Sequence, residues 1–308
     1  MAIDRSTIIR GPAVVTFNGA TLYSKGDIAL ELGLETFNVE TAMHGKVDER
    51  VVSRVARVRF TPDGQFENLG VIWPYGGMAL GDSVFGASDL PLVIKTKAGK
   101  TLTFSAAAIT RMPTLNLGAT KTMLGDIEFT CLGKNNEDWT VANNLVAVAS
   151  AAFSDSTFDS ASIVTQPYSA AWGGVSPWSS IKTLDGWTVE FDLQLNPVTT
   201  DADGIVDMTF QSLAVVARAR PLNVSESDII TALAFQGPGN ARGRSLNAGA
   251  NNLVITGTGA VVTVNAAQLK QGPMAFGASA IRSGELGWVA TRRFTAGVAS
   301  PLFTVATS

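Results

Sequence analysis

Residues that commonly carry out catalysis are scarce in this chain of 308 residues. It contains one histidine, His44, and one cysteine, Cys131. A hydrolytic triad needs a base beside a nucleophile, and a zinc site needs three or four histidine or cysteine ligands. His44 lies in a glycine-flanked segment with no nucleophile paired to it, and Cys131 lies in an apolar strand pattern typical of an inert buried thiol. The sequence therefore predicts no catalytic, cofactor-binding or metal-binding residue, and a protein that is not an enzyme.

A glycine-rich segment at 237–243 is a candidate for a phosphate-binding loop. It follows an expected helix instead of opening one, and it lacks the Lys-Ser/Thr pair that contacts phosphate. We interpret it as a connection between elements.

Four carboxylates could do acid–base chemistry, and they lie in two similar stretches. Glu31 and Glu35 belong to the first stretch, Glu190 and Asp192 to the second. A glycosidase would need two of them ~5–10 Å apart. Their alternation with apolar residues favours the polar face of half-buried strands instead. One active site also needs no second copy, so the repetition argues against an enzyme.

The two acidic stretches share a charge pattern. Residues 26–45 and 183–217 contain acids but neither lysine nor arginine, and the strand that returns from each ends in a pair of arginines. Charges segregated in this way predict a one-signed surface on one face of each hairpin. The arginines could form salt bridges across subunits. They are Arg57, Arg59, Arg218 and Arg220.

The elements that carry these residues occur twice in the sequence. Val-Ala-Arg-Val-Arg at 55–59 recurs as Val-Ala-Arg-Ala-Arg at 216–220, an offset of 161 (218 − 57). The same offset places 28–34 over 189–195, and similar offsets relate the ends of the two halves. An offset that drifts by only a few residues over a whole chain indicates an internal duplication.

The repeat divides the chain into two predicted domains of similar plan. Their bounds are 1–150 and 151–308, and the length of the chain accommodates both. A segment rich in serine, alanine and asparagine, at about 134–166, is predicted to link them.

Each half is predicted to be mainly β, a sandwich or partly open barrel with one helix. In the first half, Asn18-Gly19 between 13–17 and 20–23 predicts a tight hairpin, because both turn positions need positive φ. A long alternating strand follows from Ile28, and we expect a large loop at 36–46 before the return strand.

One helix is expected in each half. Residues 65–73 form the first candidate, which Pro74 and Gly76 end. In the second, Ser225 can cap the helix and Asp228 follows three residues later, before an apolar stripe.

The composition points to assembly. Charged residues make up 16% of the chain, whereas soluble domains average about 25%. Such a chain is expected to bury much of its surface in other subunits. The net charge of −3 does not suggest a nucleic-acid-binding surface. No apolar run reaches the ~18 residues of a membrane span, and the N-terminus lacks a signal-peptide pattern, so we expect a protein made inside the cell.

A family resemblance adds to this interpretation. The opening residues 11–19 (Gly-Pro-Ala-Val-Val-Thr-Phe-Asn-Gly) and 23–28 (Tyr-Ser-Lys-Gly-Asp-Ile), with the long acidic hairpin and single helix, resemble the major tail tube proteins of long-tailed, siphophage-type bacteriophages. The resemblance implies two packed antiparallel sheets flanked by a helix. It also implies subunits that form stacked rings around an acidic bore through which DNA is ejected.

Duplicated members of that family form trimeric rings with pseudo-sixfold symmetry, and the repeat implies this arrangement here. The resemblance implies a virion protein that is made in the host bacterial cytoplasm and inserts into no membrane. The implied partners are further copies of the chain, the tape-measure, tail-terminator and baseplate or tail-tip proteins, and viral DNA in transit.

The resemblance also assigns expected positions to the charged residues. The bore-facing acids would be Glu31, Glu35, Glu190 and Asp192. The two hairpin tips would contact the next ring, and the residues expected there are Glu40, His44, Lys46, Asp201 and Asp203.

A binding module is the main alternative. Two β-sandwiches could recognise a glycan or host surface, as an adhesin or tail fibre does. Exposed Trp172, Trp178 and Trp187 would favour it by stacking on sugars, although tryptophans near strands are usually core residues.

Overall fold

The fold is mainly β, as the sequence predicted, with one helix, α2 (Glu226–Ala232), in the described part of the chain. The residues that the computed structural model describes are 13–63, 78–86, 89–118, 124–133, 145–153, 168–200, 204–233, 251–257, 260–276, 281–292, 294–295 and 298–306, together with 235 and 245.

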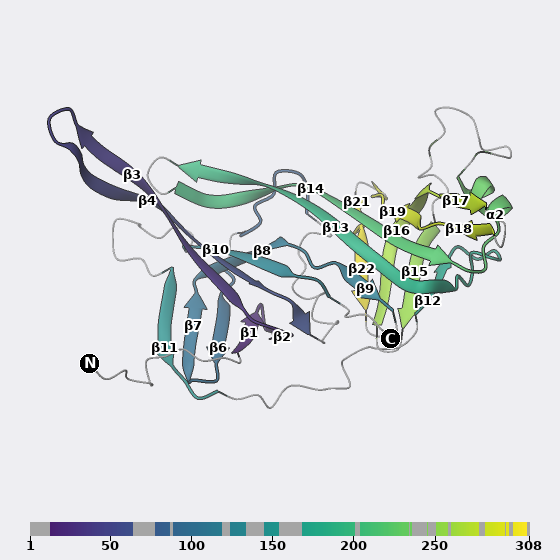
Figure 1. The fold of residues 1–308 in the computed structure, drawn as a ribbon, viewed down its shortest axis with the longest axis horizontal. Coiled ribbons are helices and arrows are strands. Elements are labelled where there is room, and N and C mark those ends of the chain that lie inside the picture. Colours follow the sequence, from purple (N-terminus) through teal and green to yellow (C-terminus); the bar gives the residue numbers. More distant parts are fainter. Residues whose placement is uncertain are drawn as a thin grey trace.

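A six-stranded sheet forms the lower layer of the first half (Figure 1). Its strands are β1 (Ala13–Phe17), β2 (Ala20–Ser24), β5 (Pro62–Asp63), β6 (Leu92–Thr96), β7 (Lys100–Phe104) and β11 (Val146–Ser150). Their order is β11-β7-β6-β1-β2-β5. The predicted Asn18-Gly19 turn is confirmed, with φ of 46° and 76°. Strand β11 lies within the predicted linker. It pairs with β7 and so forms one edge of this sheet.

A four-stranded sheet lies above it and carries the first long hairpin. Its strands are β3 (Ala29–Thr41), β4 (Gly45–Phe60), β8 (Ala106–Arg111) and β10 (Ile127–Leu132). They follow the order β3-β4-β10-β8. The prediction of a large loop at 36–46 is wrong, because β3 continues to Thr41 and β4 begins at Gly45. Register shifts after Glu35 and Val39 interrupt the alternation without ending the ladder.

The second half is built on an eight-stranded sheet. Its strands are β9 (Leu115–Leu117), β12 (Ser169–Trp172), β13 (Thr183–Thr200), β14 (Gly204–Pro221), β15 (Asn251–Gly257), β16 (Ala260–Gln271), β19 (Leu286–Val289) and β22 (Phe303–Ala306). The order is β12-β15-β16-β19-β14-β13-β9, and β22 pairs with β16. Two short pairs complete the described strands: β17 (Met274–Phe276) with β18 (Ile281–Ser283), and β20 (Phe294–Thr295) with β21 (Val298–Ala299).

Several strand pairings of the first half have counterparts in the second. In the first half β6 pairs β1 and β7, β7 pairs β11, and β10 pairs β4 and β8. In the second half β15 pairs β12 and β16, β16 pairs β22, and β19 pairs β14 and β16. The single strand β16 thus takes the places of both β7 and β8. Ala266, with a φ of +43°, lies between the residues of β16 that pair with β22 and those that pair with β19.

The two halves are joined by more than the connecting chain. Strand β9 of the first half pairs with β13, from Val189 to Trp187. The amide of Val84 donates to the carbonyl of Met208 on β14 at 2.8 Å. Buried apolar residues of both halves, including Phe129 and Trp288, belong to one hydrophobic cluster.

Helix α2 begins as the sequence predicted. The Ser225 side chain accepts from the Asp228 amide, and the Asp228 carboxylate accepts from the Ser225 amide, which makes a capping box. Ile229 is its buried residue. The other predicted helix, 65–73, lies outside the described residues.

Candidate functional site

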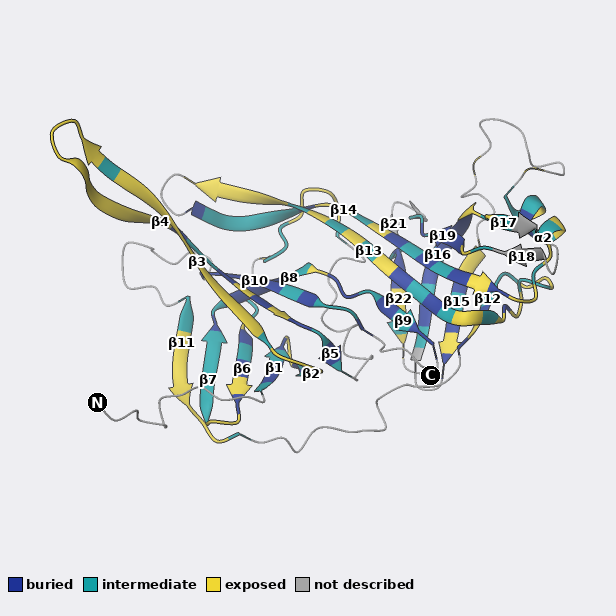
Figure 2. Cartoon of the chain, viewed as in Figure 1, coloured by how far each residue is buried: buried dark blue, intermediate teal, exposed yellow. Residues whose placement is uncertain are grey.

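The most unusual surface of the molecule is the long hairpin β3–β4. It projects beyond the rest of the chain, and Figure 2 shows that β3 and the first half of β4 are almost wholly exposed. Large apolar residues lie open on it: the exposed fractions of Leu32 and Leu34 are 65% and 66%, and that of Phe37 is 62%. β3 ends its sheet, so its outer edge has no partner strand among the described residues.

Opposite charges meet on one face of this hairpin. Glu31 lies directly opposite Arg57, and Glu35 opposite Ser53. Directly opposed residues in an antiparallel pair share a face, so the one-signed face predicted from the sequence is wrong for this hairpin. The sequence pattern separated acids and arginines along the chain, but the ladder brings them together.

Arg59 is anchored within the chain. Its Nη2 lies 2.5 Å from Oδ2 of Asp126, and the Thr61 hydroxyl donates to Oδ1 of the same carboxylate at 2.6 Å. The Thr61 hydrogen bond, followed by those of Arg59, holds the pKa of Asp126 below its usual range. Arg57 and Arg59 are both exposed, and their predicted role in pairs between subunits stays a prediction.

The second long hairpin, β13–β14, has a clear inner and outer face. Trp187 and Val189 are buried, whereas the alternate residues Glu190 and Asp192 are exposed. Glu190 Oε2 lies 3.1 Å from Nε of Arg218, so one arginine offsets part of the acidic charge.

Gln194 and Arg220 add to the polar surface of this hairpin. Asp192 Oδ1 accepts from Nε2 of Gln194 at 2.5 Å. Arg220 is exposed at the base of the hairpin. Two carboxylates and one paired arginine leave the middle of this face acidic.

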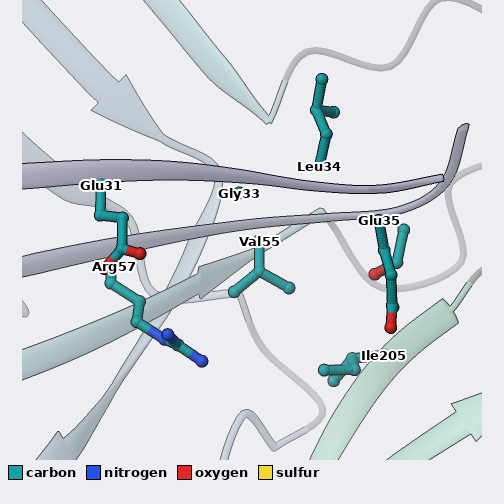
Figure 3. A pocket seen from close by; sticks show the side chains of 8 residues that line it. Glu31, Gly33, Leu34, Glu35, Val55, Arg57 and Ile205 are labelled. Atoms are coloured by element: carbon teal, nitrogen blue, oxygen red, sulfur yellow. The ribbon is translucent and has the colours of Figure 1, made fainter.

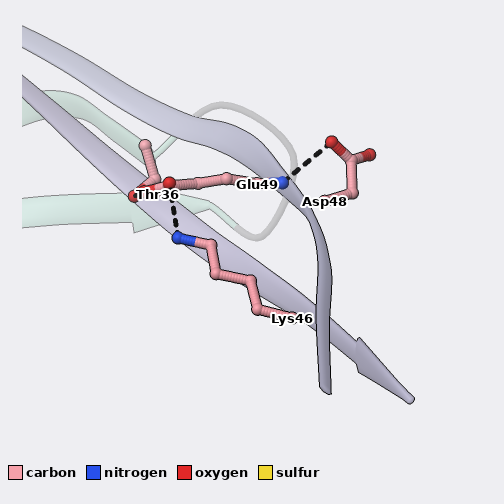
Figure 4. Close-up of polar contacts among 4 residues, drawn as sticks. All are labelled: Thr36, Lys46, Asp48 and Glu49. Atoms are coloured by element: carbon pink, nitrogen blue, oxygen red, sulfur yellow. Dashed lines mark hydrogen bonds and ion pairs between the residues drawn. The ribbon is translucent and has the colours of Figure 1, made fainter. Parts of the chain in front are cut away.

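The tip of β3–β4 is held by its own side chains (Figure 4). Lys46 Nζ lies 2.6 Å from Oε2 of Glu49, and the Thr36 hydroxyl donates to the other oxygen of Glu49. The Lys46 hydrogen bond, then that of Thr36, lowers the pKa of Glu49. The amide of His44 bonds to Thr41 at the turn, through the backbone carbonyl at 3.3 Å.

The structure locates three of the five residues predicted for the hairpin tips. Glu40, His44 and Lys46 are all exposed on the first tip. Glu40 lies opposite Lys46 in the ladder. Asp201 and Asp203 lie outside the described residues.

The two hairpins touch at a point that the sequence did not indicate. A Cβ on Gly204, at the start of β14, would lie 2.3 Å from Cβ of Ser53 on β4. Beside this contact is a hollow of about 230 Å3 (Figure 3), into which Glu31, Val55 and Arg57 project, with Ile205 across from them. Leu34 projects from the opposite side of the hairpin.

Four tryptophans form a cluster in the second half. Trp187 and Trp288 are buried, with ring centroids 5.2 Å apart. Trp172 and Trp178 are half-buried and perpendicular, 5.1 Å apart. Trp187 is therefore a core residue, whereas the other two predicted sugar-stacking residues reach the surface.

The residues considered for catalysis lie apart. His44 is at the exposed hairpin tip, and Cys131 is buried in β10, where loss of solvent raises the pKa of its thiol. The described residues contain no group of three or more His, Cys, Asp and Glu side chains placed to hold a metal ion. No helix within the described ranges is long and apolar enough to cross a membrane.

Comparison with models of known protein families gave no match, and comparison with curated protein sequences gave no significant match.

Proposed function

We propose that this chain is a non-enzymatic structural subunit that assembles into the stacked rings of a bacteriophage tail tube. The exposed hairpin β3–β4 carries this proposal. A long edge strand with open apolar residues such as Leu32 and Leu34 invites pairing with another chain. Closing such strands into a shared barrel removes the edges and covers the apolar face. The hairpin is then the ring-forming element.

Three copies in each ring are the proposed stoichiometry. The pairing pattern of β1, β6, β7 and β11 recurs in β12, β15, β16 and β22, which supports two tandem units of one plan. Two units in each chain make a six-unit ring from three chains. A ring closes a head-to-tail interface, and stacking extends the assembly along an axis.

The bore is proposed to be lined by the acid-bearing faces of the hairpins, with Glu31, Glu35, Glu190 and Asp192 toward the channel. The acidic excess comes mainly from β13–β14, because Arg57 lies beside Glu31 on the first hairpin. Carboxylates repel duplex phosphates, so DNA passes without sticking. The hairpin tips at His44 and at 201–203 are proposed to meet the next ring.

The proposal also sets partners and location. The tube begins and ends on other virion proteins of the tape-measure, terminator and tail-tip classes. The protein is made in the host bacterial cytoplasm and resides in the virion tail.

Electron microscopy of the purified protein tests the proposal. We expect rings or hollow tubes with threefold symmetry. Leu32→Lys with Leu34→Lys places charge on the open face of β3 and should leave folded monomers. Val148→Lys is the control, because Val148 is equally exposed, at 67%, but lies on the lower sheet. Wild-type protein that stays monomeric under all assembly conditions would contradict the proposal.

A further inference from the structure

A pocket lies beside helix α2, and the proposed function assigns no role to it. It has a volume of about 350 Å3, at the lower end of the range of about 300–1,000 Å3 for small-molecule sites. The turn after β12, the helix and the start of β15 form its walls. Its lining side chains include Trp172, Trp178, Asp228, Thr231 and Asn251.

The two indoles are fixed in place. Nε1 of Trp172 donates to the carbonyl of Ala267 at 2.9 Å, and the backbone amide of Trp172 donates to the carbonyl of Trp178 at 2.7 Å. Both rings also pack edge-to-face against the buried Trp288. The corner between them is therefore preformed, and a ligand that stacks there orders no further side chain.

The polar groups around the indoles are available to form hydrogen bonds with a ligand. The side chains of Ser176, Thr231 and Asn251 make no hydrogen bond within the described part of the chain, and all three residues are exposed. The capping box uses Oδ2 of Asp228. Hydroxyl, amide and carboxylate groups that converge beside aromatic rings suit a ligand with both apolar and hydroxyl-bearing surfaces.

The charge of the pocket wall indicates which class of ligand the pocket can bind. The lining residues include one carboxylate and neither lysine nor arginine. An anionic ligand such as a phosphate or a sialic acid would meet repulsion without a compensating base. A neutral sugar fits, because its C–H face packs on an indole and its hydroxyls bond to amide and carboxylate oxygens.

We infer that the pocket lined by Trp172 and Trp178 binds a neutral carbohydrate. A tube subunit with this property would also bind glycans, and the inference stands whether or not rings form. The sugar stacks in the indole corner, and Asn251 and Thr231 fix its orientation by hydrogen bonds.

Titration of the full-length protein with neutral tetrasaccharides of glucose, galactose and N-acetylglucosamine tests the inference. Binding is followed by tryptophan fluorescence and calorimetry. We expect at least one sugar to saturate with a Kd of about 0.1–1 mM. Trp178→Ala should weaken binding about tenfold or more, and Asn251→Ala should do so by a similar factor.

The controls separate binding from folding. Ser227→Ala alters α2 at an exposed position outside the pocket and should bind as the wild type does. Asn251 is exposed, so Asn251→Ala keeps the test valid if Trp178→Ala fails to fold. Absence of saturation by all three sugars, or equal binding by wild type and Asn251→Ala, would overturn the inference.

Discussion

At the residue scale, the contact of Gly204 with Ser53 shows how the two hairpins depend on one small side chain. Ser53 is buried and its hydroxyl has no hydrogen-bond partner in the described structure. Gly204 has a φ of +70°, and its backbone lies against that side chain. Any Cβ at 204 therefore meets both conformational strain and a collision.

We predict that Gly204→Ala destabilises the protein more than Gly45→Ala does. Both glycines follow a hairpin tip with positive φ, but a Cβ on Gly45 would meet nothing within 4 Å. The strain costs about 1–2 kcal/mol at either position. The collision at 204 adds about 1–3 kcal/mol. Urea unfolding of the two variants measures the difference, and equal losses would show that the hairpins do not touch in solution.

Asp126 makes stability depend on acid. Because hydrogen bonds from Thr61 and Arg59 lower its folded pKa, its contribution is present above the ordinary carboxyl pKa and is lost as the pH falls through the lowered value. The side chain is 36% exposed, so we expect Asp126→Asn to cost about 1 kcal/mol or less at pH 7. The deficit relative to wild type should shrink in acid. Urea unfolding at pH 7 and at an acidic pH checks this expectation, and a deficit that grows in acid would be inconsistent with it.

At the element scale, local patterns were predictable and long-range ones were not. The Asn18-Gly19 turn and the Ser225 cap were predicted because neighbouring residues determine each. The loop at 36–46 was wrong because two register shifts disturb the alternation while the ladder continues. The pairing of β9 with β13 joins distant segments, and no spacing in the sequence signals it.

The register of the hairpins shows a further limit to what could be predicted from the sequence. The sequence match places Glu31 over Asp192, yet Glu31 lies opposite Arg57 whereas Thr188 lies opposite the matching Arg218. The two ladders thus differ by four residues. A shift by an even number keeps every side chain on its face, so the alternation cannot reveal it. The exposed acids were predictable as a face, but their partners were not.

The tip of β3–β4 gives a prediction for one element. Glu49→Gln removes the charge that Lys46 and the Thr36 hydroxyl bind, so the tip should open more often. We expect amide hydrogen exchange at 41–49 to become about two- to tenfold faster, with little change in global stability. Glu40→Gln is the matched control on the same tip, because the Glu40 carboxylate makes no hydrogen bond or ion pair in the described structure. Unchanged exchange in Glu49→Gln would show that these bonds do not hold the tip.

At the scale of the whole molecule, the two halves are joined by strand pairing and by a common core. They share a sheet through β9 and a hydrophobic cluster, and both long hairpins lie toward the same upper side (Figure 1). An assembly that surrounds a channel needs this arrangement, because both hairpins must reach the channel together. In the proposed tube, the acid-bearing faces of the hairpins would decide how DNA meets the channel.

Reversing charge on those faces gives the corresponding prediction. Glu31→Lys with Asp192→Lys alters exposed positions, so rings and tubes should still form. Each change converts repulsion of phosphate into attraction, and three chains place six new lysines in each proposed ring. Assembled variant tubes should retain duplex DNA at low salt and release it as salt rises, because bound phosphates exchange for counterions. In phage, genome ejection should slow.

The control for this test is Val148→Lys, which adds positive charge to the lower sheet and should leave DNA passage unchanged. If the hairpin variant ejects its genome at the normal rate while Val148→Lys slows it, the lower sheet and not the hairpins faces the channel. The molecule would then be inverted relative to the proposed tube, with β3 and β13 on its outer wall. The comparison therefore tests the orientation of the subunit separately from its ability to assemble.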